Sequence, residues 1–209
     1  MIPAQDAGRR RGAARRRLAL AAVAAGVAAV DLTAKAWAQT GLSAADVEAG
    51  PVDLRLAYNP GVAFSLGAEA PAGLVIAVTA AITAAVAVFA WRAAPEGGRG
   101  QLAALALILG GAVANLADRA ADGVVTDYLH TGWWPTFNLA DTAIVTGGLL
   151  LALTTWRSDA AQRQHGRTVE ATTGEQPTAE DPAAQPSPVA PPADRSDSSP
   201  HALRDEHGR

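Results

Sequence analysis

The chain has 209 residues, of which 49% are hydrophobic, and its formal net charge is -3. It has no cysteine, which excludes disulfides, thiolate metal ligands and a thiol nucleophile, and its four histidines lack ligand spacing, so no metal site is expected. The acidic excess lies after Ser158, and the basic residues gather at the chain start rather than on a folded face, so no nucleic-acid partner is expected.

Four apolar stretches predict membrane-spanning helices, because each approaches the length that crosses a bilayer. The first, residues 18–30, is short and spans only if the helix continues to Trp37. Arginine runs precede it, so it also resembles a cleavable signal peptide, an alternative that the three further spans disfavour. Those further spans are residues 74–91, 101–117 and 139–156.

Arginines flank the spans in a pattern that predicts their direction. They precede span one, lie between spans two and three, and follow span four, which makes that side cytoplasmic. Both termini are then cytoplasmic, and residues 38–70 and 118–136 face outward. An aromatic belt of tryptophans agrees, with Trp91 and Trp156 at inner ends and Trp37, Trp133 and Trp134 at outer ends.

The first outward segment predicts a small β structure. Residues 54–58 and 62–66 alternate apolar with other side chains, and Asn59-Pro60-Gly61 between them is typical of a turn. The expected hairpin or short sheet either caps the helices or holds an extended substrate by backbone pairing.

These features predict an all-α membrane protein with four transmembrane helices, a small extracytoplasmic β hairpin or sheet, a short outer loop and a disordered C-terminal tail. We expect a disordered cytoplasmic N-terminus over residues 1–14 and a four-span membrane domain over 15–157. Residues 158–209 are rich in Pro, Ser and charge and too poor in apolar bulk to form a core, so a disordered cytoplasmic tail is expected there.

Two aspartates, Asp127 and Asp141, lie beside the outer ends of apolar segments. Carboxylates next to hydrocarbon are costly, so each is a functional-site candidate. Two carboxyl groups brought together can perform acid–base hydrolysis by water. For Asp141 a second role is open, because Asn138 and Asp141 have the spacing of an N-cap and the N3 position of span four.

Further polar residues map to the same membrane side. Asp31 and Lys35 are four apart, so they either form an ion pair within the helix or position a neighbouring loop or a substrate. Arg119 either pairs with Asp118 at the interface or holds a carboxylate or carbonyl, and Asn115 can hydrogen-bond across the bundle.

Two other classes of protein are alternatives. A transporter or channel that relays protons would place ionisable groups through the bilayer depth, whereas residues 74–89, 102–113 and 142–155 contain no charge. A structural membrane subunit would not need two aspartates at one face.

The polar residues above lie in five blocks of sequence, which are Asp31-Leu32-Thr33-Ala34-Lys35, Asn59-Pro60-Gly61-Val62-Ala63-Phe64-Ser65, Gly110-Gly111-Ala112-Val113-Ala114-Asn115-Leu116-Ala117-Asp118-Arg119, Gly123-Val124-Val125-Thr126-Asp127-Tyr128 and Phe137-Asn138-Leu139-Ala140-Asp141. In this order the blocks resemble signal peptidase II, the bacterial prolipoprotein signal peptidase. Leu32 and Ala114 depart from residues common in that family, at positions outside the carboxylate pair.

The resemblance implies an aspartyl endopeptidase of the bacterial cytoplasmic membrane, working without metal or cofactor at the outer face. Its partners would be membrane lipid and diacylglyceryl-modified prolipoproteins, cut just before the modified cysteine, and globomycin would inhibit it. The catalytic pair would be Asp127 and Asp141. The supporting residues would be Asp31, Lys35, Asn59, Asn115, Arg119 and Asn138.

Overall fold

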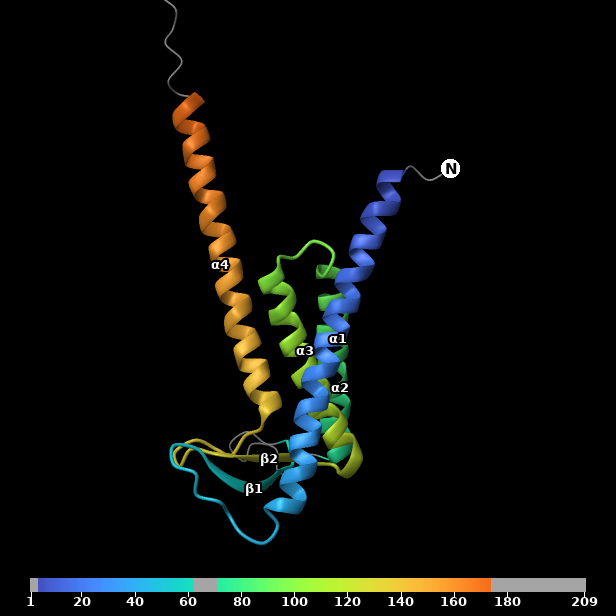
Figure 1. Cartoon of the computed structure of the whole chain (residues 1–209), viewed down its shortest axis with the longest axis vertical. Coiled ribbons are helices and arrows are strands. Elements are labelled where there is room, and N and C mark those ends of the chain that lie inside the picture. The colour runs from blue at the N-terminus through green and yellow to red at the C-terminus, as the bar shows by residue number, and fades with distance from the viewer. Residues whose placement is uncertain (1–3, 62–70, 174–209) are drawn as a thin grey trace, which may run out of the picture. The chain divides into compact units, whose positions relative to one another are not determined.

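A computed structural model describes residues 4–61 and 71–173 of the chain. Two compact units divide the chain, Met1–Gly166 and Arg167–Arg209, and the described part of the second is the last turns of a helix. In chain order the elements are α1 (Ala4–Gly41), β1 (Asp53–Asn59), α2 (Ala72–Ala93), α3 (Arg99–Asp122), β2 (Val125–His130) and α4 (Leu139–Thr173) (Figure 1).

The prediction of four membrane spans is confirmed. Among the described residues, four helices are long and apolar enough to cross a bilayer. Helix α1 continues without a break from the first apolar stretch to Gly41, as that span required. Large apolar side chains such as Ile82, Phe89 and Leu149 are exposed on the helix surfaces, which suits contact with lipid.

Both terminal helices extend further than expected. Helix α1 begins at Ala4, inside the segment predicted to be disordered, because alanine and arginine favour helix and Asp6 pairs with Arg10 one turn on at 3.2 Å. Helix α4 continues to Thr173, beyond the predicted domain limit at residue 157. The predicted tail from residue 174 onward lies outside the described residues, and the domain limits stay a prediction.

Helix α3 packs closely against α1 and α4 through adjacent glycines. A Cβ at Gly110 would lie 2.6 Å from the Ala24 carbonyl oxygen of α1, and one at Gly111 would overlap the Ala140 carbonyl oxygen of α4. Small residues let helix backbones approach in a membrane, where apolar burial alone gives little drive to associate. The two glycines therefore let both α1 and α4 approach α3 closely.

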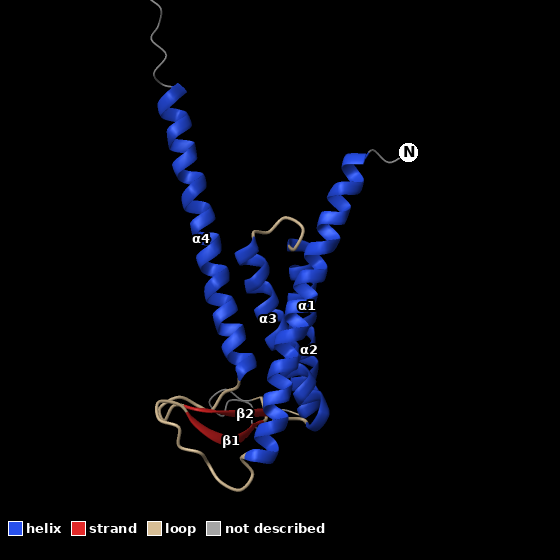
Figure 2. Ribbon diagram, viewed as in Figure 1, coloured by secondary structure: helices blue, strands red, loops and turns tan. Residues whose placement is uncertain are grey.

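The two described strands form an antiparallel sheet at one end of the helices (Figure 2). Strand β1 pairs with β2, with Ala57 opposite Asp127 and an irregularity between Leu54 and Ala57. The predicted hairpin partner of β1, residues 62–66, lies outside the described residues. Gly123, with a φ of 88°, ends α3 and turns the chain into β2, so the sheet joins both segments that were expected to face outward.

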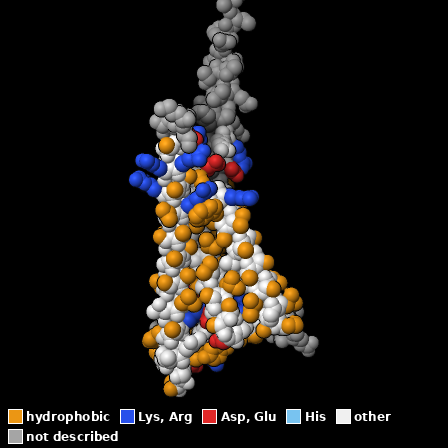
Figure 3. Space-filling view, turned by 90° about the vertical axis from the view of Figure 1, so that its right-hand side faces the viewer, with side chains coloured by type: hydrophobic (Ala, Val, Ile, Leu, Met, Phe, Trp, Pro, Cys, Tyr) orange, Lys and Arg blue, Asp and Glu red, His pale blue; other side chains and the backbone are white. Residues whose placement is uncertain are grey.

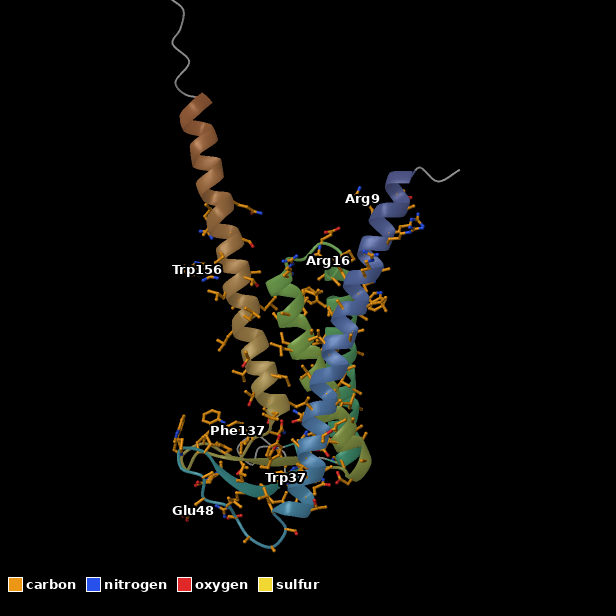
Figure 4. The ribbon with its side chains drawn as sticks, viewed as in Figure 1. Arg9, Arg16, Trp37, Glu48, Phe137 and Trp156 are labelled. Carbon is orange, nitrogen blue, oxygen red and sulfur yellow. The ribbon has the colours of Figure 1, made fainter. Side chains whose placement is uncertain are left out.

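The opposite end of the helices, which we call the basic end, gathers arginines (Figure 3). Arg16 of α1 donates to the carbonyl oxygens of Pro95 at 3.2 Å and Gly97 at 2.5 Å, in the connection between α2 and α3. Figure 4 shows Trp156 toward this end of α4 and Trp37 near the end with the sheet, which we call the sheet end. The start of α1 and the α2–α3 connection therefore share one end, as the arginine pattern required.

Candidate active site

Asp31 connects α1 to the first turn of α4. Its Oδ1 accepts a 2.8 Å hydrogen bond from the backbone N–H of Ala140, and its Oδ2 lies 2.9 Å from the Lys35 ammonium. Both side chains are almost fully buried, each with 1% of the residue exposed. The ion pair expected within α1 is thus present, and Asp31 also satisfies one of the free N–H groups of a helix N-terminus.

Lys35 also binds α3. Its ammonium donates to Oδ1 of Asn115 at 2.7 Å and lies 3.2 Å from Oδ2 of Asp118. Asp118 therefore forms its ion pair with Lys35, whereas the sequence had offered Arg119 as one possible partner. Adjacent residues on a helix point in different directions, whereas Lys35 lies directly across the α1–α3 interface.

Asn138 and Asp141 form the reciprocal cap predicted for the start of α4. The Asp141 backbone N–H donates to Asn138 Oδ1 at 2.9 Å, and the Asn138 backbone N–H donates to Asp141 Oδ2 at 3.3 Å. The other Asp141 oxygen accepts from Nδ2 of Asn115 at 2.8 Å. Two N–H donors at the helix N-terminus thus hold both carboxyl oxygens of Asp141 in place.

The same asparagine binds the second aspartate. Nδ2 of Asn138, which is fully buried, donates to Oδ1 of Asp127 at 2.7 Å and lies 3.2 Å from Oδ1 of Asn115. Asn138 therefore binds Asp127 with its amide nitrogen and Asp141 with its amide oxygen and backbone. This single residue connects the two aspartates that lie 14 positions apart in the sequence.

The surroundings of Asp127 raise the pKa of its carboxyl group. Burial, and after it the nearby negative charge of Asp141, raises the pKa of Asp127 from 3.8 to about 6. Hydrogen bonds from Asn138 and Asn59 and the charge of Lys35 act in the opposite direction and only partly offset this rise. The environment of Asp127 therefore favours its protonated form.

Arg119 and Asn59 lie on the side of the pair nearest β1. Oδ1 of Asn59 accepts from the Gly61 backbone N–H at 2.8 Å, which confirms the predicted turn, and Gly61 has a φ of 96° that disfavours other residues. The Arg119 guanidinium is 3.5 Å from where a Gly61 Cβ would lie, and its charge interacts with those of Asp127 and Asp141. The structure therefore brings all eight predicted residues into one neighbourhood.

Sequence reasoning missed two residues around β2, Gln39 and Thr126, and the contact that Asp118 makes there. The backbone N–H of Thr126, adjacent to Asp127, donates to Oδ2 of Asp118 at 2.7 Å. Its hydroxyl accepts from Nε2 of Gln39 at 2.8 Å. Gln39 lies one turn beyond Lys35 on α1, and this spacing could have predicted its role. No feature of the neighbouring sequence would have predicted that of Thr126.

An apolar groove opens beside Asp141. It has a volume of about 380 Å³, and its walls include the edge-to-face pair Trp133 and Trp134, whose ring centroids are 5.6 Å apart. Phe137, which precedes α4, and Val145 within α4 also line this apolar wall. Figure 4 shows Phe137 at the sheet end, beside the loops that connect β2 to α4. An apolar group in this groove would contact Asp141 directly.

The fold and the site define a multi-pass membrane protein with a carboxylate pair suited to acid–base hydrolysis. The family model described as "Signal peptidase (SPase) II" matches residues 23–157, and the chain belongs to this family of membrane aspartic peptidases that process prolipoproteins.

Similar proteins agree with this assignment. A "Lipoprotein signal peptidase" of Rhodococcus jostii (strain RHA1) is 36% identical over 67% of this chain and 73% of its own length. One of Syntrophomonas wolfei subsp. wolfei is 37% identical over 61% of this chain and 85% of its own length. A solved structure described as a bacterial membrane enzyme superposes with a TM-score of 0.60 at 22% identity, covering 68% of this chain and 90% of that one, and supports the fold.

Proposed function

We propose that this chain removes signal peptides from prolipoproteins by cleaving before a diacylglyceryl-modified cysteine, with Asp127 and Asp141 as the catalytic pair. The observation that supports this assignment most strongly is the position of Asn138, which hydrogen-bonds both aspartates. A carboxylate pair fixed in this way can share one proton and titrate as a unit.

In the proposed resting pair, Asp127 is the member that carries the proton at pH values up to about 6, because its pKa is raised. Asp127 is buried with a raised pKa, whereas Asp141 accepts two hydrogen bonds at a helix N-terminus. Asp141 is then the general base and Asp127 the general acid of the first step.

The reaction proceeds through a tetrahedral intermediate. Asp141 takes a proton from water, the water oxygen bonds to the scissile carbonyl carbon, and Asp127 gives its proton to the carbonyl oxygen. When the C–N bond breaks, the proton held by Asp141 passes to the leaving amine. Asp127 recovers its proton as the carbonyl re-forms, which restores the starting state of both groups.

The supporting residues act by holding this pair in place. Asp31 and Lys35 connect α1 to α4 and α3, and Asn115 and Asn138 orient the two carboxyl groups. Arg119 is suited to bind a backbone carbonyl of the substrate, because its Nε has no hydrogen-bond partner among the described residues. Asn59 holds the turn against which Arg119 lies.

Membrane lipid is part of the proposed substrate. The apolar groove beside Asp141 is suited to an acyl chain of the modified cysteine, since acyl chains prefer apolar surroundings to water. Globomycin is expected to block the same site, as it does in the family.

The proposed location is the bacterial inner membrane, with both termini cytoplasmic and the active site at the outer face. The arginines at the basic end support this orientation through the positive-inside rule (Figure 3). In the proposed organisation the peptidase domain is residues 15–157, so a chain truncated after Asp159 should still process substrate.

Processing of a lipidated preprotein by the purified enzyme tests the function. Asp127→Asn and Asp141→Asn should leave the protein inserted in the membrane yet accumulate uncleaved substrate on a gel, and globomycin should stop the unmodified enzyme. Asp159→Asn, an exposed carboxylate on α4, is the matched control. Normal processing by either active-site variant would refute the assignment.

A further inference from the structure

Helix α1 presents three polar side chains one turn apart, each bound to a different element. Asp31 binds the start of α4, Lys35 binds α3 and Gln39 binds β2. The i, i+4, i+8 spacing places all three on one face of the helix. Asp31 binds the residue before Asp141, and Gln39 binds the residue before Asp127.

We propose that Gln39 is a positioning residue for Asp127, acting through Thr126. This inference rests on the proposed catalytic role of Asp127. Asp31 fixes one aspartate from α1, and Gln39 fixes the other from the same helix, so α1 sets the relative placement of the pair.

The contacts of Thr126 explain how Gln39 can position Asp127. Thr126 is fully buried and held at two atoms, by Gln39 at its hydroxyl and by Asp118 at its backbone N–H. Successive side chains of a strand point to opposite faces. A strand fixed at Thr126 cannot rotate about its own axis, so the direction of the Asp127 side chain is fixed as well.

Strand β2 needs anchors of this kind. It has six residues, and among the described residues its partners are the strand β1 and, at the far end from Thr126, an isolated bridge from Leu129 to Phe137. Two-stranded sheets are marginally stable without further packing. Asn138 binds the carboxyl group of Asp127, and Gln39 holds the side chain of the preceding residue, Thr126.

Kinetics of the full-length enzyme on a diacylglyceryl-modified peptide spanning the cleavage junction test the inference. Gln39→Met keeps the length of the side chain and removes the donor, and Thr126→Val removes the acceptor at almost constant volume. Each should lower kcat by about 5- to 20-fold, the loss expected for one misplaced hydrogen bond, with KM changed by less than about twofold. The double variant should be no slower than either single variant, because both remove one interaction.

Thr40→Val is the matched control, since this neighbouring hydroxyl is exposed and donates to carbonyl oxygens of its own helix. It should keep the kcat of the unmodified enzyme. Tryptophan fluorescence on heating should show that every variant remains folded at the assay temperature.

Three results would overturn the inference: an unchanged kcat in Gln39→Met, a double variant whose loss is the product of the single losses, or a loss found in KM alone. Asp127→Asn is measured beside these variants. If it cleaves normally, the proposed function fails, whereas an inactive Asp127→Asn beside a fully active Gln39→Met refutes only the role of Gln39.

Discussion

Replacing Asp127 by Asn removes a carboxyl group that the folded protein ionises with difficulty. The pKa of Asp127 is about 6 when folded, against 3.8 for an unperturbed aspartate, because of burial and then the charge of Asp141. The folded state therefore binds this proton more tightly than the unfolded state. Stability from this group is present below about pH 4 and is lost as the pH rises toward 6.

The size of the effect follows from the shift. A rise of the Asp127 pKa from 3.8 to about 6 corresponds to about 3 kcal/mol of unfolding free energy. The unmodified protein loses this stability above pH 6, whereas Asp127→Asn does not. Asn keeps an oxygen that accepts from Asn138, so the hydrogen bond is retained. The variant should melt about 6 to 12 °C higher at pH 8 and at nearly the same temperature at pH 4.

Intrinsic tryptophan fluorescence of the detergent-solubilised protein measures this difference, since the chain has five tryptophans and no cysteine for thiol dyes. Asp159→Asn should melt like the unmodified protein at both pH values, because that carboxylate is exposed. Burial and the charge of Asp141 would not be what destabilises ionised Asp127 if Asp127→Asn were less stable than the unmodified protein at pH 8. The same would follow if the difference in melting temperature between the two proteins did not depend on pH.

Two further predictions follow from the helix contacts and the carboxylate pair. Gly111→Ala should push the first turn of α4 away from α3, because its Cβ would overlap the Ala140 carbonyl, and should cost about 1–3 kcal/mol of stability and most of the activity. Gly148→Ala, where a Cβ meets open space, is its control, and equal melting temperatures and rates for the two variants would contradict the packing argument. The pH profile of kcat/KM should fall above about pH 6, because the mechanism needs the proton on Asp127, and a rate that rises steadily from pH 6 to 8 would exclude that role.

Features with a local cause were predictable from the sequence. The four spans follow from apolar length, because backbone groups in a bilayer must be satisfied within each helix. The cap formed by Asn138 and Asp141 follows from their three-residue spacing, and the turn at Gly61 from its own neighbours. In each case the interacting groups lie within one turn of chain.

Features that depend on packing between distant segments were not predictable. Asp31 binds the backbone of Ala140 across 109 positions, which no periodicity indicates. The sequence offered Arg119 as a possible partner of its neighbour Asp118, whereas helix packing places Asp118 against Lys35. The partner of β1 is likewise a strand that follows two intervening helices, so its register is set by where α3 ends.

Asp127 and Asp141, joined by Asn138, are proposed to act as one catalytic unit. Turnover of a lipidated substrate by the two single Asn variants and by the double variant measures whether they do. Each single substitution should lower kcat by at least about 10³-fold, and the double variant should be no slower than the singles, because groups acting as a unit are not additive. A single variant that retains a tenth or more of the normal rate, or losses that multiply in the double variant, would contradict this proposal.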